Sequence, residues 1–342
     1  EFVSGVDGVR IQQWVKEANF TYAEAKKLGH YSFYENAIAD HIEKILTLEW
    51  VDVDAISRAN FNVAVDAVNS TGGIAIAQLL KKLGVKRSTI LNGEPTGVFA
   101  HNPEPLPEHL AEISDLIDKN SFHVCFVVDP DVDRLAIVME NGEMFGEEYS
   151  LVAIADYILQ NQKGNTVSNL SSTRALRDIS EKYGVSYAAA AVGEVNVVEK
   201  MKETNAIIGG EGNGGIILPA LHYGRDALVG IALFLTYMAK TKKSPVQIKS
   251  QFPSYFISKN KIELKPETNV PHILDCVAEK YKAYSVNRID GVKVDFEDNW
   301  IHLRASNTEP IIRIYAEATN MSIAENLAKK ILNDIKEIIN EQ

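Results

Sequence analysis

Short apolar runs alternate with helical patterns through the first two thirds of the chain. The runs are rich in valine, isoleucine and alanine, which is typical of strands buried within a sheet. The segments between them repeat apolar residues every three or four positions, as helices that cover a sheet do. Predicted strands lie at 63–68, 88–91, 124–128, 135–139, 165–169, 186–190 and 206–208. Predicted helices lie at 9–18, 36–48, 74–83, 107–119, 149–159, 172–183, 194–203 and 226–239. This alternation predicts mainly parallel sheets covered by helices.

The pattern changes after TKKSPVQ, residues 241–247. The strands predicted beyond it lie at 261–264, 291–296, 300–305 and 311–318, and the helices at 270–284 and 323–339. The last helix has a single apolar stripe, formed by Ile323, Leu327, Ile331, Ile335 and Ile338. One stripe predicts a helix that packs on one face of a sheet. Because most of these strands follow one another directly, the sheet is predicted to be antiparallel.

These patterns predict an α/β fold with two similar α/β domains, whose mixed sheets are covered by helices, followed by a smaller α+β C-terminal domain. We place the α/β domains at 37–147 and 148–245, and the α+β domain at 246–342. Residues 1–36 start without a methionine and are interpreted as the remnant of a preceding domain with its linker.

The composition is that of an ordinary soluble globular protein, with 46% hydrophobic and 24% charged residues. A net charge of −11 argues against a general nucleic-acid or anionic-membrane surface, and an anionic substrate would need a locally positive pocket. No apolar run reaches the roughly 18–20 residues that span a membrane. Only Cys125 and Cys276 are present, so we expect no disulfide framework and a cytoplasmic location. Cys125 is expected to pack in the core.

The stretch HVCFVVDPDVDRLAIVM, residues 123–139, places three aspartates between two apolar strands. Asp129, Asp131 and Asp133 repel one another unless a positive charge lies nearby. Their hard oxygen ligands favour Mg²⁺, Ca²⁺ or Mn²⁺ over zinc. An EF-hand loop is the main alternative, but its sixth position is Arg134 instead of glycine and its flanks resemble strands. A metal-binding loop is therefore preferred to a solvated acidic turn.

Three other polar segments are candidate ligand sites. GGEGNGG, residues 209–215, holds Glu211 and Asn213 on a flexible backbone, which suits either a binding loop or a tight turn. RASNTEPIIR, residues 304–313, gathers arginine, serine, asparagine and threonine between two strands, as phosphate binding requires, although a surface turn is also possible. NSTGG, residues 69–73, is interpreted as a structural turn from strand to helix, with phosphate binding as the alternative.

Together, DPDVDR, GEGNGG and RASNTEPIIR resemble, in order, the metal, sugar and phosphate loops of the α-D-phosphohexomutases, the group of phosphoglucomutase/phosphomannomutase and phosphoglucosamine mutase. The resemblance covers nearly the whole chain. It implies Mg²⁺ as cofactor and a phosphorylated hexose as substrate. The implied reaction interconverts hexose 1-phosphate and hexose 6-phosphate through a phosphoserine and a bisphosphate intermediate.

The resemblance also implies roles for individual residues. The implied metal ligands are Asp129, Asp131 and Asp133, with Arg134 in a supporting catalytic role, and the implied sugar-binding residues are Glu211 and Asn213. The implied phosphate ligands are Arg304, Ser306, Asn307, Thr308 and Arg313. Glu309 is expected to support the turn, because its carboxylate would repel phosphate. The family often has serine in place of Asn213. Some members have a histidine where Glu194 stands, so Glu194 is interpreted as a first-turn helix residue.

The family's first domain carries a TASHNP-like segment whose serine is phosphorylated, and these 342 residues contain no such segment. We therefore expect a fragment of a phosphohexomutase that is inactive alone. One alternative is a non-catalytic phosphosugar-binding protein. Another is a metal-dependent phosphatase with Asp129 as nucleophile, which leaves Asp133 and Arg134 unexplained. The phosphate loop reads SNTEP at 306–310. This form resembles phosphoglucomutase/phosphomannomutase more than the SGTEP form that is common in phosphoglucosamine mutases, so glucose or mannose phosphate is favoured as substrate.

Overall fold

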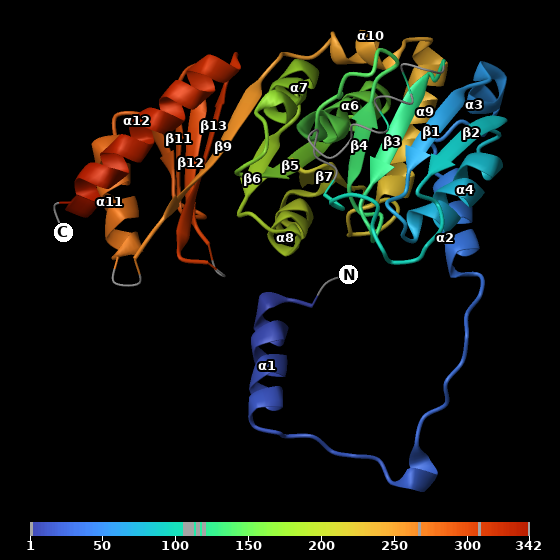
Figure 1. Ribbon diagram of the computed structural model, residues 1–342, viewed down its shortest axis with the longest axis horizontal. Helices are drawn as coiled ribbons and strands as arrows, with labels where there is room; N and C mark the ends of the chain where they lie inside the picture. Colours follow the sequence, from blue (N-terminus) through green and yellow to red (C-terminus); the bar gives the residue numbers. More distant parts are fainter. Residues whose placement is uncertain are drawn as a thin grey trace. The chain divides into compact units, whose positions relative to one another are not determined.

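The computed structural model describes residues 3–104, 113, 117, 121–265, 268–306 and 309–340 (Figure 1). The chain divides into two compact units. The first unit comprises Glu1–Phe145 and Gly215–Pro245, and the second comprises Gly146–Gly214 and Val246–Gln342. The segment 215–245 thus packs with the earlier part of the chain, although it follows the sugar-loop motif in sequence.

The sheet of the first unit contains the strands β1 (Asn62–Asp66), β2 (Arg87–Leu91), β3 (Val124–Val128) and β4 (Leu135–Val138). Their order is β2-β1-β3-β4. β1 pairs in parallel with both β2 and β3, whereas β4 returns antiparallel beside β3. Every residue of β3 and β4 is buried, which explains their continuous apolar sequences. The sheet is therefore mixed, as predicted.

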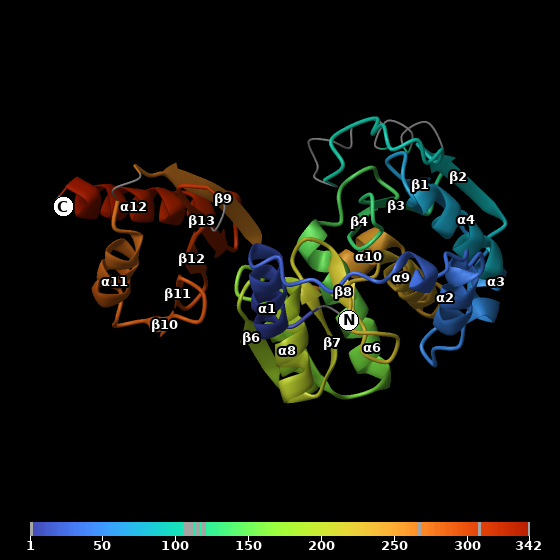
Figure 2. The same ribbon diagram turned by 90° about the horizontal axis from the view of Figure 1, so that it is seen from below.

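Helices α2 (Ala37–Leu46), α3 (Val53–Ala59), α4 (Gly72–Lys82) and α9 (Ala227–Thr241) pack around this sheet. α9 is buried from Ala227 to Met238, in agreement with its uniformly apolar sequence. α2 directs Ile42 and Ile45 into the core and lies beside α9 (Figure 2). The ring of Phe234 on α9 packs edge-on against Phe126 of β3.

The N-terminal segment contains α1 (Gly5–Lys16) and the short 3₁₀ helix η1 (Ala25–Lys27). None of the residues of α1 is buried. The helix begins four residues before the predicted start at residue 9 because the Ser4 side chain accepts a hydrogen bond from the Asp7 amide, a helix N-cap.

In the second unit, β6 (Tyr187–Ala190), β5 (Asn165–Asn169) and β7 (Ala206–Glu211) lie side by side in that order and are parallel. Helices α6 (Glu147–Asn161), α7 (Ala175–Tyr183) and α8 (Glu194–Thr204) pack against these strands. The strands and helices alternate along the chain, which is the α/β arrangement that the sequence predicts. The short strand β8 (Gly215–Ile217) follows in sequence and belongs to the first unit.

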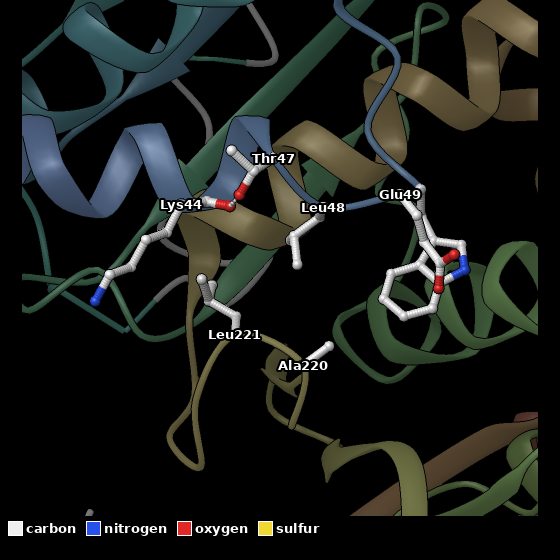
Figure 3. A pocket seen from close by; sticks show the side chains of 7 residues that line it. Lys44, Thr47, Leu48, Glu49, Ala220 and Leu221 are labelled. Atoms are coloured by element: carbon white, nitrogen blue, oxygen red, sulfur yellow. Dashed lines mark hydrogen bonds between the residues drawn. The ribbon is translucent and has the colours of Figure 1, made fainter.

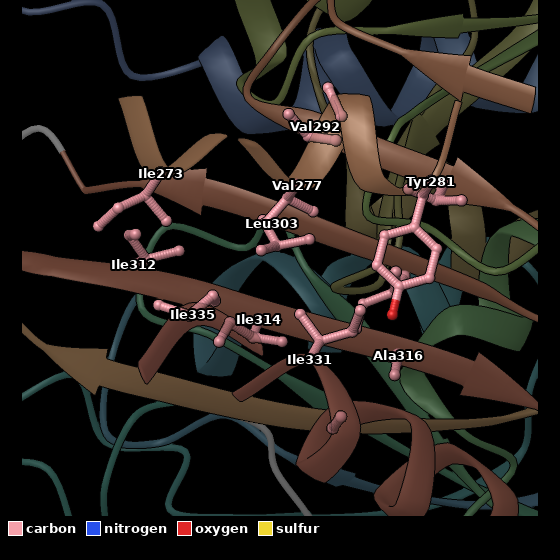
Figure 4. Close-up of a cluster of buried hydrophobic side chains, with 14 residues drawn as sticks. Ile273, Val277, Tyr281, Val292, Leu303, Ile312, Ile314, Ala316, Ile331 and Ile335 are labelled. Atoms are coloured by element: carbon pink, nitrogen blue, oxygen red, sulfur yellow. The ribbon is translucent and has the colours of Figure 1, made fainter. Parts of the chain in front are cut away.

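After the short helix α10 (Pro245–Lys249), an antiparallel sheet has the order β10-β11-β12-β13-β9. Its strands are β9 (Phe256–Glu263), β10 (Ser285–Asn287), β11 (Val292–Asp295), β12 (Trp300–Ala305) and β13 (Ile311–Ala318). Helices α11 (Val270–Lys280) and α12 (Met321–Asn340) pack on the sheet, and apolar side chains from both helices and the strands form one core (Figure 4). This is the predicted α+β arrangement.

Most predicted elements are present, with ends shifted by a few residues. The elements η1, α3, β8, α10 and β10 were not predicted. α3 is too short for a helical period to stand out, and it depends on the Asp52 carboxylate, which accepts a hydrogen bond from the Ala55 amide. β9 begins five residues before the prediction because Phe256 and Ile257 pair with the end of β13. The helix predicted at 107–119 lies almost wholly outside the described residues.

None of the described helices combines the length and the apolar composition that crossing a bilayer would require.

Candidate functional site

The predicted metal loop joins β3 to β4 and turns around the carboxylate of Asp129. Asp129 Oδ1 accepts hydrogen bonds from the amides of Asp133 (3.1 Å) and Arg134 (3.0 Å). Val132 has φ = 62°, a left-handed conformation that a β-branched residue rarely adopts. Such strained residues cluster at functional sites. Candidate ligand atoms of Asp129, Asp131 and Asp133 all lie within 4.8 Å of one another. Strands on both sides exclude the EF-hand alternative.

The loop concentrates negative charge where water has little access. Asp129 is only 5% exposed, whereas Asp131 is exposed. Burial and the nearby charge of Asp133 raise the pKa of Asp129 to about 7. Asp133 Oδ1 is buried without a hydrogen-bond partner among the described residues. A buried oxygen without a partner beside two other carboxylates fits a hard divalent cation with oxygen ligands.

Two arginines partly balance this charge. Arg134 Nε lies 3.4 Å from Asp129 Oδ2 and 3.9 Å from Asp133 Oδ1, which agrees with the supporting role expected for Arg134. Arg225, which precedes α9, donates to Asp133 Oδ2. The sequence did not single out Arg225, because the contact joins residues far apart along the chain.

The NSTGG turn supports the metal loop directly. The hydroxyl groups of Ser70 and Thr71 both donate to the backbone carbonyl of Pro130, at 2.7 and 2.9 Å. On another side, the turn packs closely against the segment after β2, since a Cβ on Gly73 would lie 1.8 Å from the Gly93 carbonyl oxygen. The segment joins β1 to α4, as predicted, and its two hydroxyls hold Pro130, which lies between the first two aspartates.

Glu211 ends β7, at the carboxyl edge of the parallel strands. Open α/β sheets bind ligands at this edge. Its side chain is 6% exposed, and Oε1 accepts hydrogen bonds from Asn169 Nδ2 (2.9 Å) and the Gly193 amide (3.2 Å). These contacts hold the carboxylate in one place. Asn213 lies two residues further on, in the turn after β7, and is half-buried.

The glycine between these two residues allows a close approach. A Cβ on Gly212 would lie 2.0 Å from Glu148 Oε2. Glu148 accepts a hydrogen bond from the Thr173 amide (2.8 Å), and burial raises its pKa well above the usual value. The Gly212 amide donates to Ser172 Oγ (2.9 Å). The turn is thus packed against α6 and the start of α7, and Glu148 is a supporting residue that the sequence did not indicate.

The candidate phosphate loop joins β12 to β13. Arg304 and Arg313 are direct partners in the antiparallel register, so two positive side chains face each other across the strands. Like charges in such a pair are destabilising unless an anion lies between or near them. Arg313 Nε is buried without a hydrogen-bond partner among the described residues, and Arg313 Nη2 lies 3.7 Å from Glu309. The pair fits a phosphate dianion.

The rest of this loop is only partly described. The Ser306 amide donates to the Ile311 carbonyl, and Ser306 Oγ accepts from the Glu309 amide at 3.3 Å. Glu309 therefore takes part in the turn, as expected. Asn307 and Thr308 lie outside the described residues.

The segment Val192–Gly193 connects the sugar and phosphate candidates within the second unit. The Gly193 amide contacts Glu211, and the Val192 amide donates to Asp290 Oδ2 at 3.0 Å. The same Asp290 oxygen lies 3.5 Å from Arg304 Nη1. Glu194 begins α8 directly after this segment and lies in its first turn, so its structural interpretation is confirmed.

Three family models match the chain in consecutive order. They describe domain II of phosphoglucomutase/phosphomannomutase at residues 39–142, domain III at 146–255 and the C-terminal domain at 265–334. The chain belongs to the α-D-phosphohexomutase family. Each of the three loops lies within or next to a different domain of that family, in the order that the sequence motifs indicated.

Relatives in this family carry different names. The phosphoglucomutase/phosphomannomutase of Thermococcus kodakarensis is 34% identical over 83% of this chain, and the phosphoglucosamine/phosphogalactosamine mutase of Sulfurisphaera tokodaii is 32% identical over 90%. The matches cover 62% and 66% of those proteins, so the chain spans a little less than two thirds of their length. A family protein from Burkholderia thailandensis has the same fold, with a TM-score of 0.81 over 98% of this chain and 70% of its own at 23% identity.

Proposed function

We propose that this chain supplies the metal-binding, sugar-binding and phosphate-binding parts of a phosphohexomutase that interconverts hexose 1-phosphate and hexose 6-phosphate. The observation that carries the proposal is the facing pair Arg304 and Arg313, whose nearest carboxylates lie 3.5 and 3.7 Å away, in a chain that belongs to this family. The reaction would proceed through a phosphoserine and a bisphosphate intermediate, as in the family.

The phosphate group of the sugar would bind where the two arginine side chains face each other, with donors from Ser306, Asn307 and Thr308. Arginine forks and small hydroxyl or amide donors match the oxygens of a phosphate monoester. Asp290 would compete with the phosphate for Arg304, since Asp290 Oδ2 lies 3.5 Å from its Nη1. Binding of the phosphate dianion would therefore replace the ion pair between Arg304 and Asp290 with a stronger ion pair between Arg304 and the doubly charged phosphate.

Glu211 would accept hydrogen bonds from the ring hydroxyls, with Asn213 as a further partner. Hydroxyl groups both donate and accept, so a carboxylate beside an amide satisfies a vicinal pair. The Asn169 and Gly193 contacts to Glu211 Oε1 orient the carboxylate before the sugar arrives. Such preorganisation lowers the entropic cost of binding.

Asp129, Asp131 and Asp133 would hold Mg²⁺, with Arg134 and Arg225 as partners of the same carboxylates. When bound, the cation neutralises negative charge at the phosphoryl group that is transferred. These 342 residues contain no TASHNP-like segment, and we propose that they show no mutase turnover alone. We also propose the domain division 37–147, 148–245 and 246–342, and a cytoplasmic location, which suits two free cysteines.

Glucose or mannose phosphate is the proposed substrate class. SNTEP at 306–310 supports this choice, as does the name of the Thermococcus relative. A phosphoglucosamine mutase is the second candidate, because the Sulfurisphaera relative and several other archaeal relatives carry that name. Parallel titrations with glucose 1-phosphate, mannose 1-phosphate and glucosamine 1-phosphate would rank the two candidates.

Calorimetric titration of this chain with glucose 1-phosphate is expected to show binding, while glucose alone shows none. Arg304→Ala is expected to weaken binding at least tenfold, because it removes a charged donor from the phosphate position. Arg288→Ala is the matched control, since Arg288 is an exposed arginine of the same domain that pairs with Asp275.

Equal loss of binding in both arginine variants would contradict the assignment of the phosphate position. Mutase turnover by the native chain would contradict the proposal that the chain is inactive alone. Binding by the native chain without turnover, even when a phosphoserine-bearing family domain is added, would support a non-catalytic phosphosugar-binding protein.

A further inference from the structure

Two histidines from separate segments meet one buried carboxylate in the first unit. His41 lies on α2, His222 lies in the loop before α9, and Asp226 is the N-cap of α9. Asp226 Oδ2 lies 2.7 Å from His41 Nε2 and 3.1 Å from His222 Nε2. A ligand atom from each of these residues lies within 4.8 Å of the other two. All three residues lie outside the metal, sugar and phosphate loops.

The helix cap does not account for this arrangement. Asp226 Oδ1 already accepts the Val229 amide at 3.0 Å, which is the bond that an N-cap requires. The second oxygen faces both imidazole rings, whose centroids are 5.6 Å apart. Two imidazoles and one carboxylate are a ligand set that binds zinc in proteins.

We propose that His41, His222 and Asp226 bind a divalent transition metal ion of the zinc class, with a water molecule in the fourth position. Imidazole nitrogen favours Zn²⁺, Co²⁺, Ni²⁺ and Cu²⁺ over Mg²⁺, whereas the all-oxygen loop at Asp129 favours Mg²⁺. The two sites therefore select different metals. This inference does not rest on the proposed mutase activity.

The burial of the three side chains suits such a site. The side chain of Asp226 is only 6% exposed, while those of His41 and His222 are 30% and 40% exposed. The carboxylate is thus held inside the protein, and the histidine side leaves access for an ion and a water.

The distances from Asp226 to the two histidines can be compared with those of a metal site. Bonds of about 2.0–2.2 Å to a tetrahedral ion place ligand atoms about 3.3–3.6 Å apart, further than the present 2.7 and 3.1 Å. The same two segments line a cavity of about 360 Å³, with Lys44, Thr47 and Leu48 on one side and Ala220 and Leu221 on the other (Figure 3). The loop that bears His222 is therefore not tightly packed against the end of α2.

Metal binding also requires that the proton leave Nε2 of each histidine, because the metal binds the lone pair of that nitrogen. A neutral imidazole that now donates from Nε2 would carry its proton on Nδ1 instead. A protonated imidazole would release one proton to solvent. Protons compete with the metal for the imidazole nitrogens as the pH falls. Zinc affinity is expected to decrease below neutral pH.

The test is a titration of the EDTA-treated chain with Zn²⁺ against a chromophoric chelator, and with Co²⁺ followed by its visible absorption. One equivalent is expected to bind, with a Co²⁺ spectrum of tetrahedral type and a melting temperature raised by several degrees. His222→Gln is expected to weaken binding at least tenfold, and it retains a donor for Asp226 so that the loop stays folded. His41→Gln is expected to act in the same way.

Two control variants separate this site from the other candidate ligands. His272→Ala removes the surface histidine that lies 3.5 Å from the Cys276 sulfur, and Asp131→Asn removes an exposed carboxylate of the metal loop. Both are expected to leave zinc affinity unchanged. The proposal is overturned if the native chain binds no zinc, or if zinc affinity survives in both histidine variants with circular dichroism unchanged.

Discussion

Gly291→Ala is expected to destabilise the chain by about 2–5 kcal/mol, the sum of two costs. Gly291 has φ = +69°, a left-handed conformation that costs other residues about 1–2 kcal/mol. A Cβ there would also lie 2.0 Å from the Leu303 carbonyl oxygen and 3.1 Å from the Arg304 Cα. Both are backbone atoms of β12, so β11 and β12 would have to separate.

The displacement would reach the proposed phosphate position, because Arg304 follows Leu303 on the same strand. Glucose 1-phosphate affinity of the folded fraction is expected to fall together with stability. Gly184→Ala is the control, since Gly184 has φ = +66° but nothing within 4 Å of its Cβ position. Urea unfolding followed by circular dichroism should give Gly184→Ala only the conformational loss of about 1–2 kcal/mol. Similar losses in both variants would show that the close approach to β12 has no energetic consequence.

The sequence was most informative where burial imposes a regular pattern. β3 has the predicted bounds, because this strand lies inside its sheet, is apolar along its length and ends at a polar turn. α9 was also evident, since a helix buried on all sides is apolar on all sides. Segments of this kind can be predicted without knowing which parts of the chain pack against them.

The supporting residues of the site were not predictable in the same way. Arg225 contacts Asp133, Ser70 contacts Pro130, and Asp290 contacts the Val192 amide, and each contact joins segments distant in sequence. Their chemistry is ordinary for surface turns until the fold brings the partners together. The motif residues were found because several polar side chains of one type cluster locally, whereas a single supporting side chain gives no such signal.

The pair His41 and His222 shows the same limit more strongly. The two histidines are separated by most of the α/β region, and neither lies in a motif with ligand spacing. Only the packing of α2 beside α9 brings both rings to Asp226. Sites built from single residues on separate elements therefore have to be found in the structure.

Asp129→Asn is expected to reduce Mg²⁺ affinity at least a hundredfold while the chain stays folded. Asparagine keeps the Oδ1 acceptor for the amides of Asp133 and Arg134, but it removes the ionised ligand. The native chain should gain about 2.7 kcal/mol of stability at a Mg²⁺ concentration of about 100 times Kd, and the variant should gain none. Thermal unfolding with and without Mg²⁺ measures this difference, with Asp298→Asn as an exposed control.

Asp129→Ala separates the metal role from the structural role. It leaves two amides of the loop without their acceptor, which is expected to cost about 1–3 kcal/mol even without metal.

The pH dependence of stability tests the same residue. Burial and the charge of Asp133 raise the pKa of Asp129 to about 7 in the folded chain. Between about pH 4 and 7 the unfolded chain therefore releases this proton while the folded chain keeps it, so the metal-free native chain should lose stability as the pH rises through this range. Mg²⁺ should abolish that loss, and Asp129→Asn should lack it at any Mg²⁺ concentration. A native pH profile that Mg²⁺ leaves unchanged would contradict Asp129 as a metal ligand.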